Sequence, residues 1–526
     1  MAVDLEDKSV LIVVKRLEDL SALRRLMAEL GSRDIHVASS ANMALNMLRM
    51  QPFDLCVVES FLGTGEKSGL QVVEEAIREG LKPETGAFVL ITPEDTKALP
   101  NDSLDYGADT FVTRPLDLEK LQLRLEKLLK LKQAVYPVES LIEQGDYEKA
   151  LNAIDVMSRK YPSLKLYLQR LQGRLLVVTE AYDRAQELFE RLLNDRKLLW
   201  AHMGLGIVAY RTGRYGEAAA HFNEILRVCP ESIEAYDWLS KVYRGIGRNQ
   251  DAQKLLEKAV QVLPTAPALQ AGLGDVASEN SNWAVAIDAF RCAVKFAKRS
   301  CHQTQTNYFG LARCLQTRIA KHGGASSAEA EREAVRTLED VVSEYRDDDL
   351  IRFKSRLMTS ETYKRSGDIA RANAAVKDAF AVFKRLDDSK QAEELDNLIE
   401  GVEGTVLQPE VDAYKSDFNK RVFTETEWGR YNLQGMGLYR KGRFGEAFDC
   451  FCQALESVPN SPSVLLNLVQ TGYSLIQQEP ERAQEVLAVC NDRLLRMSIG
   501  AMNTKQQERY RALSGRRAEF ASLESS

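Results

Sequence analysis

The length, composition and charge of the chain exclude several classes of protein. Its 526 residues are too many for a single hydrophobic core, so we expect two or more domains. Charged residues make up 28% and hydrophobic residues 44%, which is the range of folded globular proteins. A formal net charge of -6 provides no broad positive field for nucleic acid or anionic lipid.

The first residues, MAVDLEDKSVLIVV, lack the basic region and long apolar core of a secretory signal. No apolar run reaches the roughly 18 to 20 residues that a membrane span needs. The cysteines form no CxxC pair and have no neighbouring histidine at metal-ligand spacing; they lie at positions 56, 229, 292, 301, 314, 450, 452 and 490. We therefore expect a cytoplasmic protein with reduced thiols and with no metal or cofactor.

Short apolar runs alternate with helical patterns over residues 1–128. The runs at 10–14, 36–38, 55–58, 88–91 and 110–112 predict strands. After each run, apolar residues recur at helical spacing, as in the first helical segment with Leu17, Leu20, Leu23, Leu26 and Leu30 before Gly31. Five such units predict a doubly wound parallel sheet with right-handed crossovers, an α/β fold.

The order of these elements and four of their segments resemble the receiver domain of bacterial response regulators, which is flavodoxin-like. The segments are FDLCVVE, SGLQVVEEAI, FVLITPED and GADTFVTRPLDLEKL. In that family an acidic pair after the first strand binds magnesium, and an aspartate after the third strand accepts a phosphoryl group. A hydroxyl residue after the fourth strand contacts that group, and a lysine before a proline after the fifth strand neutralises it.

Most of the chemical groups that the resemblance implies are replaced in this chain. By position, the acidic pair falls on Val14 and Lys15, the acceptor on Glu59, the hydroxyl on Thr92, the switch aromatic on Phe111, and the lysine on Arg114 before Pro115. An alkyl group and an ammonium leave too few oxygen ligands for magnesium. The extra methylene of a glutamate moves the carboxylate away from in-line attack. We therefore expect a degenerate receiver that is not phosphorylated.

Charge indicates what replaces the lost chemistry. Lys15 and Arg114 are two cations at the strand ends around Glu59, so we expect an ion cluster that holds the loops in one conformation. The alternative is a vestigial pocket in which both cations point into solvent.

The rest of the chain shows an internal repeat in place of strand patterns. An alanine followed four residues later by an apolar residue recurs, and the first five alanines are spaced 35, 33, 34 and 34 residues apart. The alanines are Ala150, Ala185, Ala218, Ala252, Ala286, Ala334, Ala372, Ala447 and Ala483. With the surrounding Leu, Gly, aromatic and Pro positions, this pattern resembles the tetratricopeptide repeat (TPR), a unit of two helices. It predicts an all-α superhelical solenoid.

Two segments depart from the repeat. The insertion TRIAKHGGASSAEA predicts a loop after a lengthened helix, and residues 386–427 are either a degenerate repeat or a long helix joining two subarrays. The polar tail from Asn503 is expected to be a helical cap on the last repeat. The predicted domains are the receiver at 1–128, the first repeats at 129–300, repeats with the insertion at 301–400, and C-terminal repeats with the cap at 401–526.

A solenoid binds its partners in a concave groove, which is lined by the first helix of each pair. We expect these positions to be exposed, and those that carry residue types enriched at interfaces are candidates for partner binding. They are Trp200, Met203, Ile207, Tyr210, Arg211, Lys241, Arg244, Asn432, Met436, Tyr439 and Arg440. The five histidines lie beside no nucleophile in any catalytic motif, and no phosphate loop, GxSxG or HExxH is present, so an enzyme is not expected.

The sequence predicts a non-enzymatic bacterial signalling adaptor. Its receiver would dock through the fourth helix, fifth strand and fifth helix, as the resemblance implies, and the charged helix LEKLQLRLEKLLKLKQ would join the domains stiffly. Its solenoid would sequester or scaffold proteins, and homodimerisation is left open. The alternatives are a conventional phosphorelay regulator and a nucleic-acid-binding solenoid, the latter disfavoured by the acidic balance.

Overall fold

The computed structural model of the chain describes residues 5–63, 67–92, 108–321, 325–497, 502 and 504–516. The chain forms two compact units, one made of residues 1–208 and 297–303 and the other of residues 209–296 and 304–526. Within the described ranges, no helix combines the length and apolar character needed to span a membrane.

The first unit begins with a five-stranded parallel sheet in the order β2-β1-β3-β4-β5. Its strands are β1 (Ser9–Val13), β2 (Asp34–Ala38), β3 (Leu55–Glu59), β4 (Ala87–Thr92) and β5 (Thr110–Thr113), with helices α1 (Leu17–Glu29), α2 (Ala41–Met50) and α3 (Gly69–Arg78) between them. The order reverses between β1 and β3, which is the switch point of a doubly wound sheet. The predicted α/β fold of the first domain is therefore confirmed.

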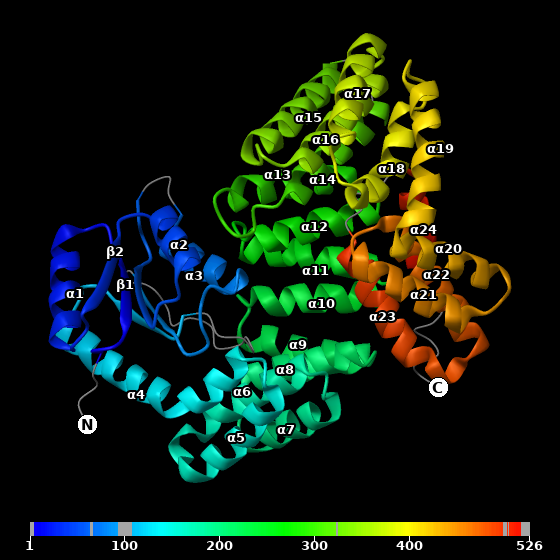
Figure 1. The fold of residues 1–526 in the computed structure, drawn as a ribbon. Coiled ribbons are helices and arrows are strands. Elements are labelled where there is room, and N and C mark those ends of the chain that lie inside the picture. Colours follow the sequence, from blue (N-terminus) through cyan, green and yellow to red (C-terminus); the bar gives the residue numbers. More distant parts are fainter. Residues whose placement is uncertain are drawn as a thin grey trace. The chain divides into compact units, whose positions relative to one another are not determined.

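Alternate residues of the strands face two separate hydrophobic layers. Val10, Ile12 and Val57 pack with α1 and with α4 (Leu118–Glu143), whereas Leu11 and Val58 pack with α2 and α3. Figure 1 shows α1 on one side of the sheet and α2 and α3 on the other. Full burial of each such side chain contributes roughly 1.5–3 kcal/mol, so both layers fix the strand ends in place.

Helix α4 continues from the sheet into the first helices of the repeat array, α5 (Tyr147–Lys160), α6 (Lys165–Val178) and α7 (Tyr182–Asp195) (Figure 1). The Lys132 ammonium lies 2.9 Å from the Glu139 carboxylate and donates to the Glu84 carbonyl at 2.7 Å. Tyr167 of α6 also donates to Glu139, and Arg174 pairs with Glu84. These buried contacts tie the receiver to the first repeats, as expected for a stiff connection.

The remaining chain is helical, and its helices alternate as repeat pairs. From α8 to α16 the bounds are α8 (Leu199–Arg211), α9 (Tyr215–Val228), α10 (Ile233–Gly245), α11 (Asn249–Val262), α12 (Pro267–Glu279), α13 (Trp283–Ala297), α14 (Gln305–Lys321), α15 (Ala325–Glu344) and α16 (Asp349–Ser366). They continue with α17 (Ile369–Phe383), α18 (Asp388–Val402), α19 (Gln408–Glu425), α20 (Glu427–Arg440), α21 (Phe444–Ser457), α22 (Pro462–Gln478), α23 (Ala483–Arg496) and α24 (Thr504–Gly515).

The repeat alanines lie on the second helix of each pair. Eight of the nine are fully buried, and Ala483 is half-buried. Glycines on the facing helices leave room for the aromatic ring that follows some of these alanines: a Cβ on Gly173 or Gly204 would come within 2.4 Å of the Phe189 ring. The predicted all-α solenoid is confirmed, and its close helix packing depends on these small residues.

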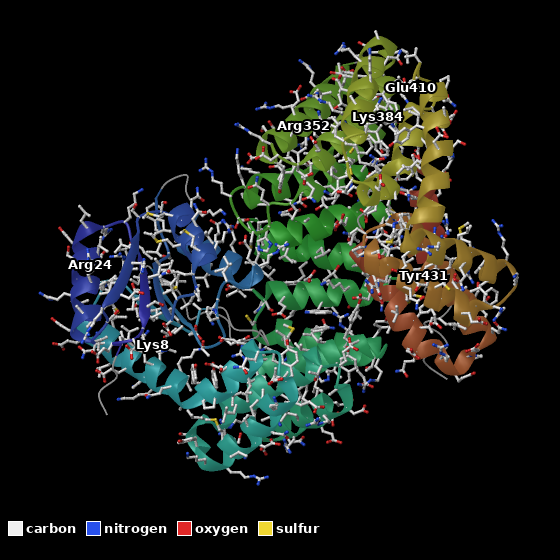
Figure 2. All side chains as sticks on the ribbon, in the orientation of Figure 1. Lys8, Arg24, Arg352, Lys384, Glu410 and Tyr431 are labelled. Atoms are coloured by element: carbon white, nitrogen blue, oxygen red, sulfur yellow. The ribbon has the colours of Figure 1, made fainter. Side chains whose placement is uncertain are left out.

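Residues 386–427 form the helix pair α18 and α19, which supports a degenerate repeat over a single long connecting helix. Lys384, which directly follows α17, lies 3.6 Å from Glu410 of α19, and Figure 2 labels both residues. Helix α14 is lengthened to 17 residues, as predicted, and residues 322–324 of the insertion lie outside the described ranges. Helix α24 packs on α22, and its Tyr510 donates to Glu279 of α12, so it does more than cap the last repeat.

Candidate functional site

The receiver pocket lies at the carboxyl ends of the parallel strands, where open α/β sheets bind ligands. Lys15 follows β1, Glu59 ends β3, Thr92 ends β4, and Arg114 follows β5. The structure therefore brings together the residues that the sequence analysis assigned to this pocket.

Both carboxylate oxygens of Glu59 are engaged by the protein. The Arg114 guanidinium donates to Oε1 at 2.5 Å, and the backbone N–H of Lys15 donates to Oε2 at 3.1 Å. Glu59 is 5% exposed, so little of its carboxylate remains open to solvent. A buried carboxylate with two such donors is held in one orientation.

Arg114 bridges two acids. Its guanidinium also donates to Asp19 of α1 at 2.9 Å. Burial alone would lower the pKa of Arg114, but the hydrogen bond to Asp19 and the charge of Glu59 outweigh it and raise that pKa. Glu59, Arg114 and Asp19 therefore form an ion cluster.

Lys15 contacts Glu59 through its main chain. Its backbone N–H donates to the Glu59 carboxylate, and its exposed side chain lies over Gly63, where an added Cβ would come within 2.3 Å of the ammonium nitrogen. A place for the Lys15 ammonium in the ion cluster stays a prediction. Val14 is 2% exposed and belongs to the sheet core. Neither side chain at the former acidic positions offers an oxygen to a cation.

Thr92 and Phe111 are both held by the sheet. The Thr92 hydroxyl is buried and donates to the Val112 carbonyl at 3.5 Å, a long contact. The Phe111 ring is half-buried with the Arg124 guanidinium 5.8 Å from its centre, and Arg124 also donates to the Phe111 carbonyl. Arg124 on α4 thus fixes the aromatic residue that would switch in a phosphorylated receiver.

The loop after Glu59 is fixed by backbone contacts. Ser60 N–H donates to the Ile91 carbonyl at 2.7 Å, and Gly69 N–H donates to the Ser60 carbonyl at 2.9 Å. A Cβ at Gly69 would lie 2.1 Å from the Glu59 carbonyl oxygen, so only glycine allows α3 to approach this closely. The loop after Glu59 and the start of α3 are therefore packed closely against each other.

Four of the predicted groove residues are buried in repeat packing. Trp200, Met203, Ile207 and Tyr210 are at most 8% exposed, and rings of Phe189 and Trp238 pack against Trp200 and Tyr210 respectively. The expectation that these side chains are exposed is wrong, because large aromatic and aliphatic groups fill the space between neighbouring repeats.

The predicted basic residues of the groove have partners inside the chain. Arg211 pairs with Asp492 of α23 at 2.9 Å, and Lys241 pairs with Asp237 and lies over the Trp238 ring. Arg244 is buried against Glu279, which also accepts from Tyr510 of α24. Within the second unit, the C-terminal helices thus occupy the inner face of α10 and α12.

Three of the late-repeat candidates line one cleft. Met436, Tyr439 and Arg440 of α20 line a cleft with Asn467 and Gln470 of α22, and Asn432 lies 3.5 Å from Asn467. Arg509 of α24 donates to Asn467 and Gln470. Their role in partner binding stays a prediction.

Among the described residues, Glu74, Cys301 and His302 place three possible metal-ligand atoms within 4.8 Å of one another. All three belong to the first unit. Burial raises the pKa of Cys301, and burial lowers the pKa of His302. A thiol with a raised pKa is a poor source of the thiolate that metals bind, and Arg78 donates to the Cys301 carbonyl beside it.

Sequence reasoning missed Asp19 and Arg124. Asp19 lies one turn into α1, and its only signal was an acid near the start of a helix, which ordinarily complements the helix dipole. The predicted docking surface includes the fourth helix of the receiver, and residues 93–107, between β4 and β5, lie outside the described ranges.

Relatives of known function match the first part of the chain. The response regulator protein PmrA of Pseudomonas aeruginosa is 30% identical over 141 residues, 25% of this chain and 61% of that protein. The two-component response regulator PhoP of the same organism is 26% identical over 212 residues, 40% of this chain and 91% of that protein. The chain therefore spans less than two thirds of PmrA.

The later part matches repeat proteins. The tetratricopeptide repeat family matches residues 167–231 and 239–299. The C-terminal part of a TPR repeat-containing protein from Cytophaga hutchinsonii aligns with 50% of this chain and 99% of its own, at 16% identity and a TM-score of 0.38. The MamA protein aligns with 35% of this chain and 91% of its own, at 19% identity and a TM-score of 0.29. Together the sequence matches, the parallel sheet and the repeat helices support a fusion in which the N-terminal part is similar to response regulators and the later part contains tetratricopeptide repeats.

Proposed function

We propose that this protein is a non-enzymatic signalling adaptor in the cytoplasm, with a receiver that is not phosphorylated and a repeat array that binds protein partners. The proposal that the receiver is not phosphorylated rests on the hydrogen bonds of the Glu59 carboxylate. Its two oxygens accept from Arg114 and from the Lys15 backbone, so neither is free for attack on a phosphoryl donor.

The metal side of the reaction is also unsupported by the residues at the site. Phosphoryl transfer relies on magnesium to bridge and neutralise the developing charge. Val14 is buried in the core, and Lys15 brings a positive charge to the position of the second acid. These residues do not fit a magnesium ion, because a hard cation needs oxygen ligands.

The second half of the proposal rests on the repeats. Repeat arrays present extended inner surfaces, and here a cleft lined by Met436, Tyr439 and Arg440 combines an apolar, an aromatic and a basic residue. Such residue types dominate the energy of protein interfaces.

The phosphorylation claim is tested by incubating the full chain with acetyl phosphate and Mg²⁺ and measuring its intact mass. We expect no added phosphoryl group, while a conventional receiver treated in parallel gains one. A magnesium-dependent gain that is lost in Glu59→Gln would favour the phosphorelay alternative.

A further inference from the structure

A cleft within the second unit is formed by the first helices of three successive repeats. Its floor and sides come from Phe309, Arg313 and Gln316 of α14, Leu357 of α16 and Asn397 of α18, and Thr504 at the start of α24 closes one side. The cleft encloses about 600 Å³, including the solvent at its mouth. Its lining combines apolar side chains with polar groups, as the lining of ligand sites does.

The carboxylates of the cleft all have partners. Glu394 lies 2.7 Å from the Lys354 ammonium, Glu361 lies 2.8 Å from Arg365, and Glu400 accepts from the backbone N–H of Thr504 at 3.0 and 3.1 Å. These acids therefore need no further cation from a ligand.

Arg313 differs from them. In the described part of the chain its guanidinium has no hydrogen bond or ion pair, and its Nε is buried without a partner. Glu361 and Glu400 act on it only as more distant charges. Burial and the neighbouring Arg365 lower the pKa of Arg313, so its positive charge is under-compensated where it stands.

Two amide oxygens beside Arg313 also lack partners among the described residues. Gln316 is fully buried, and its amide nitrogen donates to the Met358 carbonyl at 2.8 Å and to Thr362 at 3.0 Å. The Asn397 amide nitrogen donates to Glu394 at 2.7 Å. These bonds fix both amides with their oxygens unpaired, so the cleft still offers two acceptors.

We propose that this cleft binds an acidic residue of a partner polypeptide, whose side-chain carboxylate pairs with Arg313 while backbone N–H groups donate to Gln316 and Asn397. The inference rests on the proposed protein-binding function of the array. A guanidinium binds a planar carboxylate through paired hydrogen bonds. The apolar faces of Phe309 and Leu357 suit the methylene groups of such a side chain.

The same features argue against a phosphate ligand. Phosphate has no N–H group for the two amide oxygens, and its second negative charge would meet Glu361, Glu394 and Glu400 around the cleft. An acidic peptide residue carries a single charge together with backbone donors, so it matches both features.

The test uses saturation-transfer difference NMR on the full chain, which detects weak ligands of large proteins. The probes are the blocked tripeptides acetyl-Ala-Glu-Ala-amide and acetyl-Ala-Gln-Ala-amide, with inorganic phosphate as a competitor. We expect signal transfer to the Glu peptide at least tenfold above that to the Gln peptide, no competition by phosphate, and loss of the signal in Arg313→Gln. The control Arg332→Gln, at an exposed arginine of α15 outside the cleft, should bind like the wild type.

The melting temperature separates binding from a structural role. Removing an unpaired buried charge should leave the melting temperature of Arg313→Gln equal to or above that of the wild type. If that variant fails to fold, Arg313→Lys keeps the charge without the planar fork and should bind the Glu peptide several-fold more weakly. Equal transfer to both peptides, absence of transfer, or unchanged binding in the Arg313 variants would overturn the inference. The acetyl phosphate experiment tests the receiver independently of the cleft. A negative peptide-binding result would therefore leave the proposal that the receiver is not phosphorylated unaffected.

Discussion

The receiver pocket holds a buried carboxylate with partners, whereas the Arg313 cleft holds a half-buried guanidinium whose buried Nε has no partner among the described residues. Glu59 is held by Arg114 at 2.5 Å and by the Lys15 backbone at 3.1 Å, whereas Arg313 has no ion pair or hydrogen bond within the described ranges. A buried charge without a partner is costly, and a ligand can remove that cost. In the receiver pocket, groups of the chain itself pair with the buried acid, whereas in the repeat array our proposal assigns that role to a partner.

Arg114→Met should destabilise the receiver pocket, and we expect the largest loss of stability from this substitution. It leaves the Glu59 and Asp19 carboxylates without their shared cation, and loss of one member of a buried pair costs about 3–5 kcal/mol. Because the Arg114 side chain is 21% exposed, we expect the lower end of that range. Hydrogen exchange of peptides covering β3 and β5 measures the change.

The matched control is Arg24→Met, an exposed arginine on α1 that Figure 2 labels. It should change the free energy of opening, as measured by hydrogen exchange, by less than about 0.5 kcal/mol. The double variant Glu59→Gln, Arg114→Met should recover much of the loss, since it removes the stranded charge. An Arg114→Met receiver as stable as the wild type would show that the pocket is vestigial.

Gly69→Ala tests whether the pocket wall is as tightly built as the ion cluster implies. The new Cβ would lie 2.1 Å from the Glu59 carbonyl oxygen, and overpacking of this kind costs about 1–3 kcal/mol. Protection of β3 against hydrogen exchange should fall accordingly. Gly216→Ala on α9 has open space around its Cβ and should stabilise its helix by up to about 1 kcal/mol; equal effects of both variants would contradict this account.

Tyr510→Phe tests what holds α24 against the repeat array. This helix matters for the Arg313 cleft because its Thr504 lines one side of the cleft. The change removes the hydrogen bond to buried Glu279, which is worth about 1 kcal/mol. Exchange over residues 504–516 should quicken about fivefold. Tyr431→Phe, whose hydroxyl makes only a long, exposed contact to Glu427 and which Figure 2 labels, should leave this exchange unchanged. If hydrogen exchange in Tyr510→Phe is the same as in the wild type, the Tyr510 hydroxyl does not hold α24 in place.

Asp275→Asn should change stability by an amount that depends on pH. Burial, with an added contribution from Glu279, raises the pKa of Asp275 to about 7 in spite of Arg244. An acid with a raised folded-state pKa binds its proton more tightly when folded, so it lowers stability as pH rises from about 4 through 7. The variant should melt above the wild type at pH 8 and near it at pH 5. A constant difference at both values would show that Asp275 ionises normally.

Much of the fold followed from local patterns in the sequence. Apolar runs located the strands, and alanines at a spacing near 34 located the second helix of each repeat, because both reflect burial against immediate neighbours. The carboxyl ends of parallel strands also share one edge, so Glu59 and Arg114 could be paired in advance. Asp19 could not, because its approach depends on how α1 packs on the sheet.

The inner groove was harder to predict. Exposure of Trp200, Met203, Ile207 and Tyr210 was expected from their repeat positions, but side-chain size decided the outcome, and large apolar groups filled gaps between repeats. Arg244 was expected to face a partner, yet α12 and α24 supply Glu279 and Tyr510 from 35 and 266 residues away. Contacts between residues so far apart in the chain leave no local pattern in the sequence. Arg313 likewise is notable only because its surroundings lack an acid in contact.

The central claim is that the receiver pocket is closed by the protein's own charges, and ¹⁹F NMR of the full chain with Mg²⁺ and beryllofluoride tests it most directly. Beryllofluoride occupies the position of a phosphoryl group on a receiver acid, and a conventional receiver serves as the positive control. We predict only the signals of free beryllofluoride for the wild type. A bound signal that requires Mg²⁺ and disappears in Glu59→Gln would contradict the account.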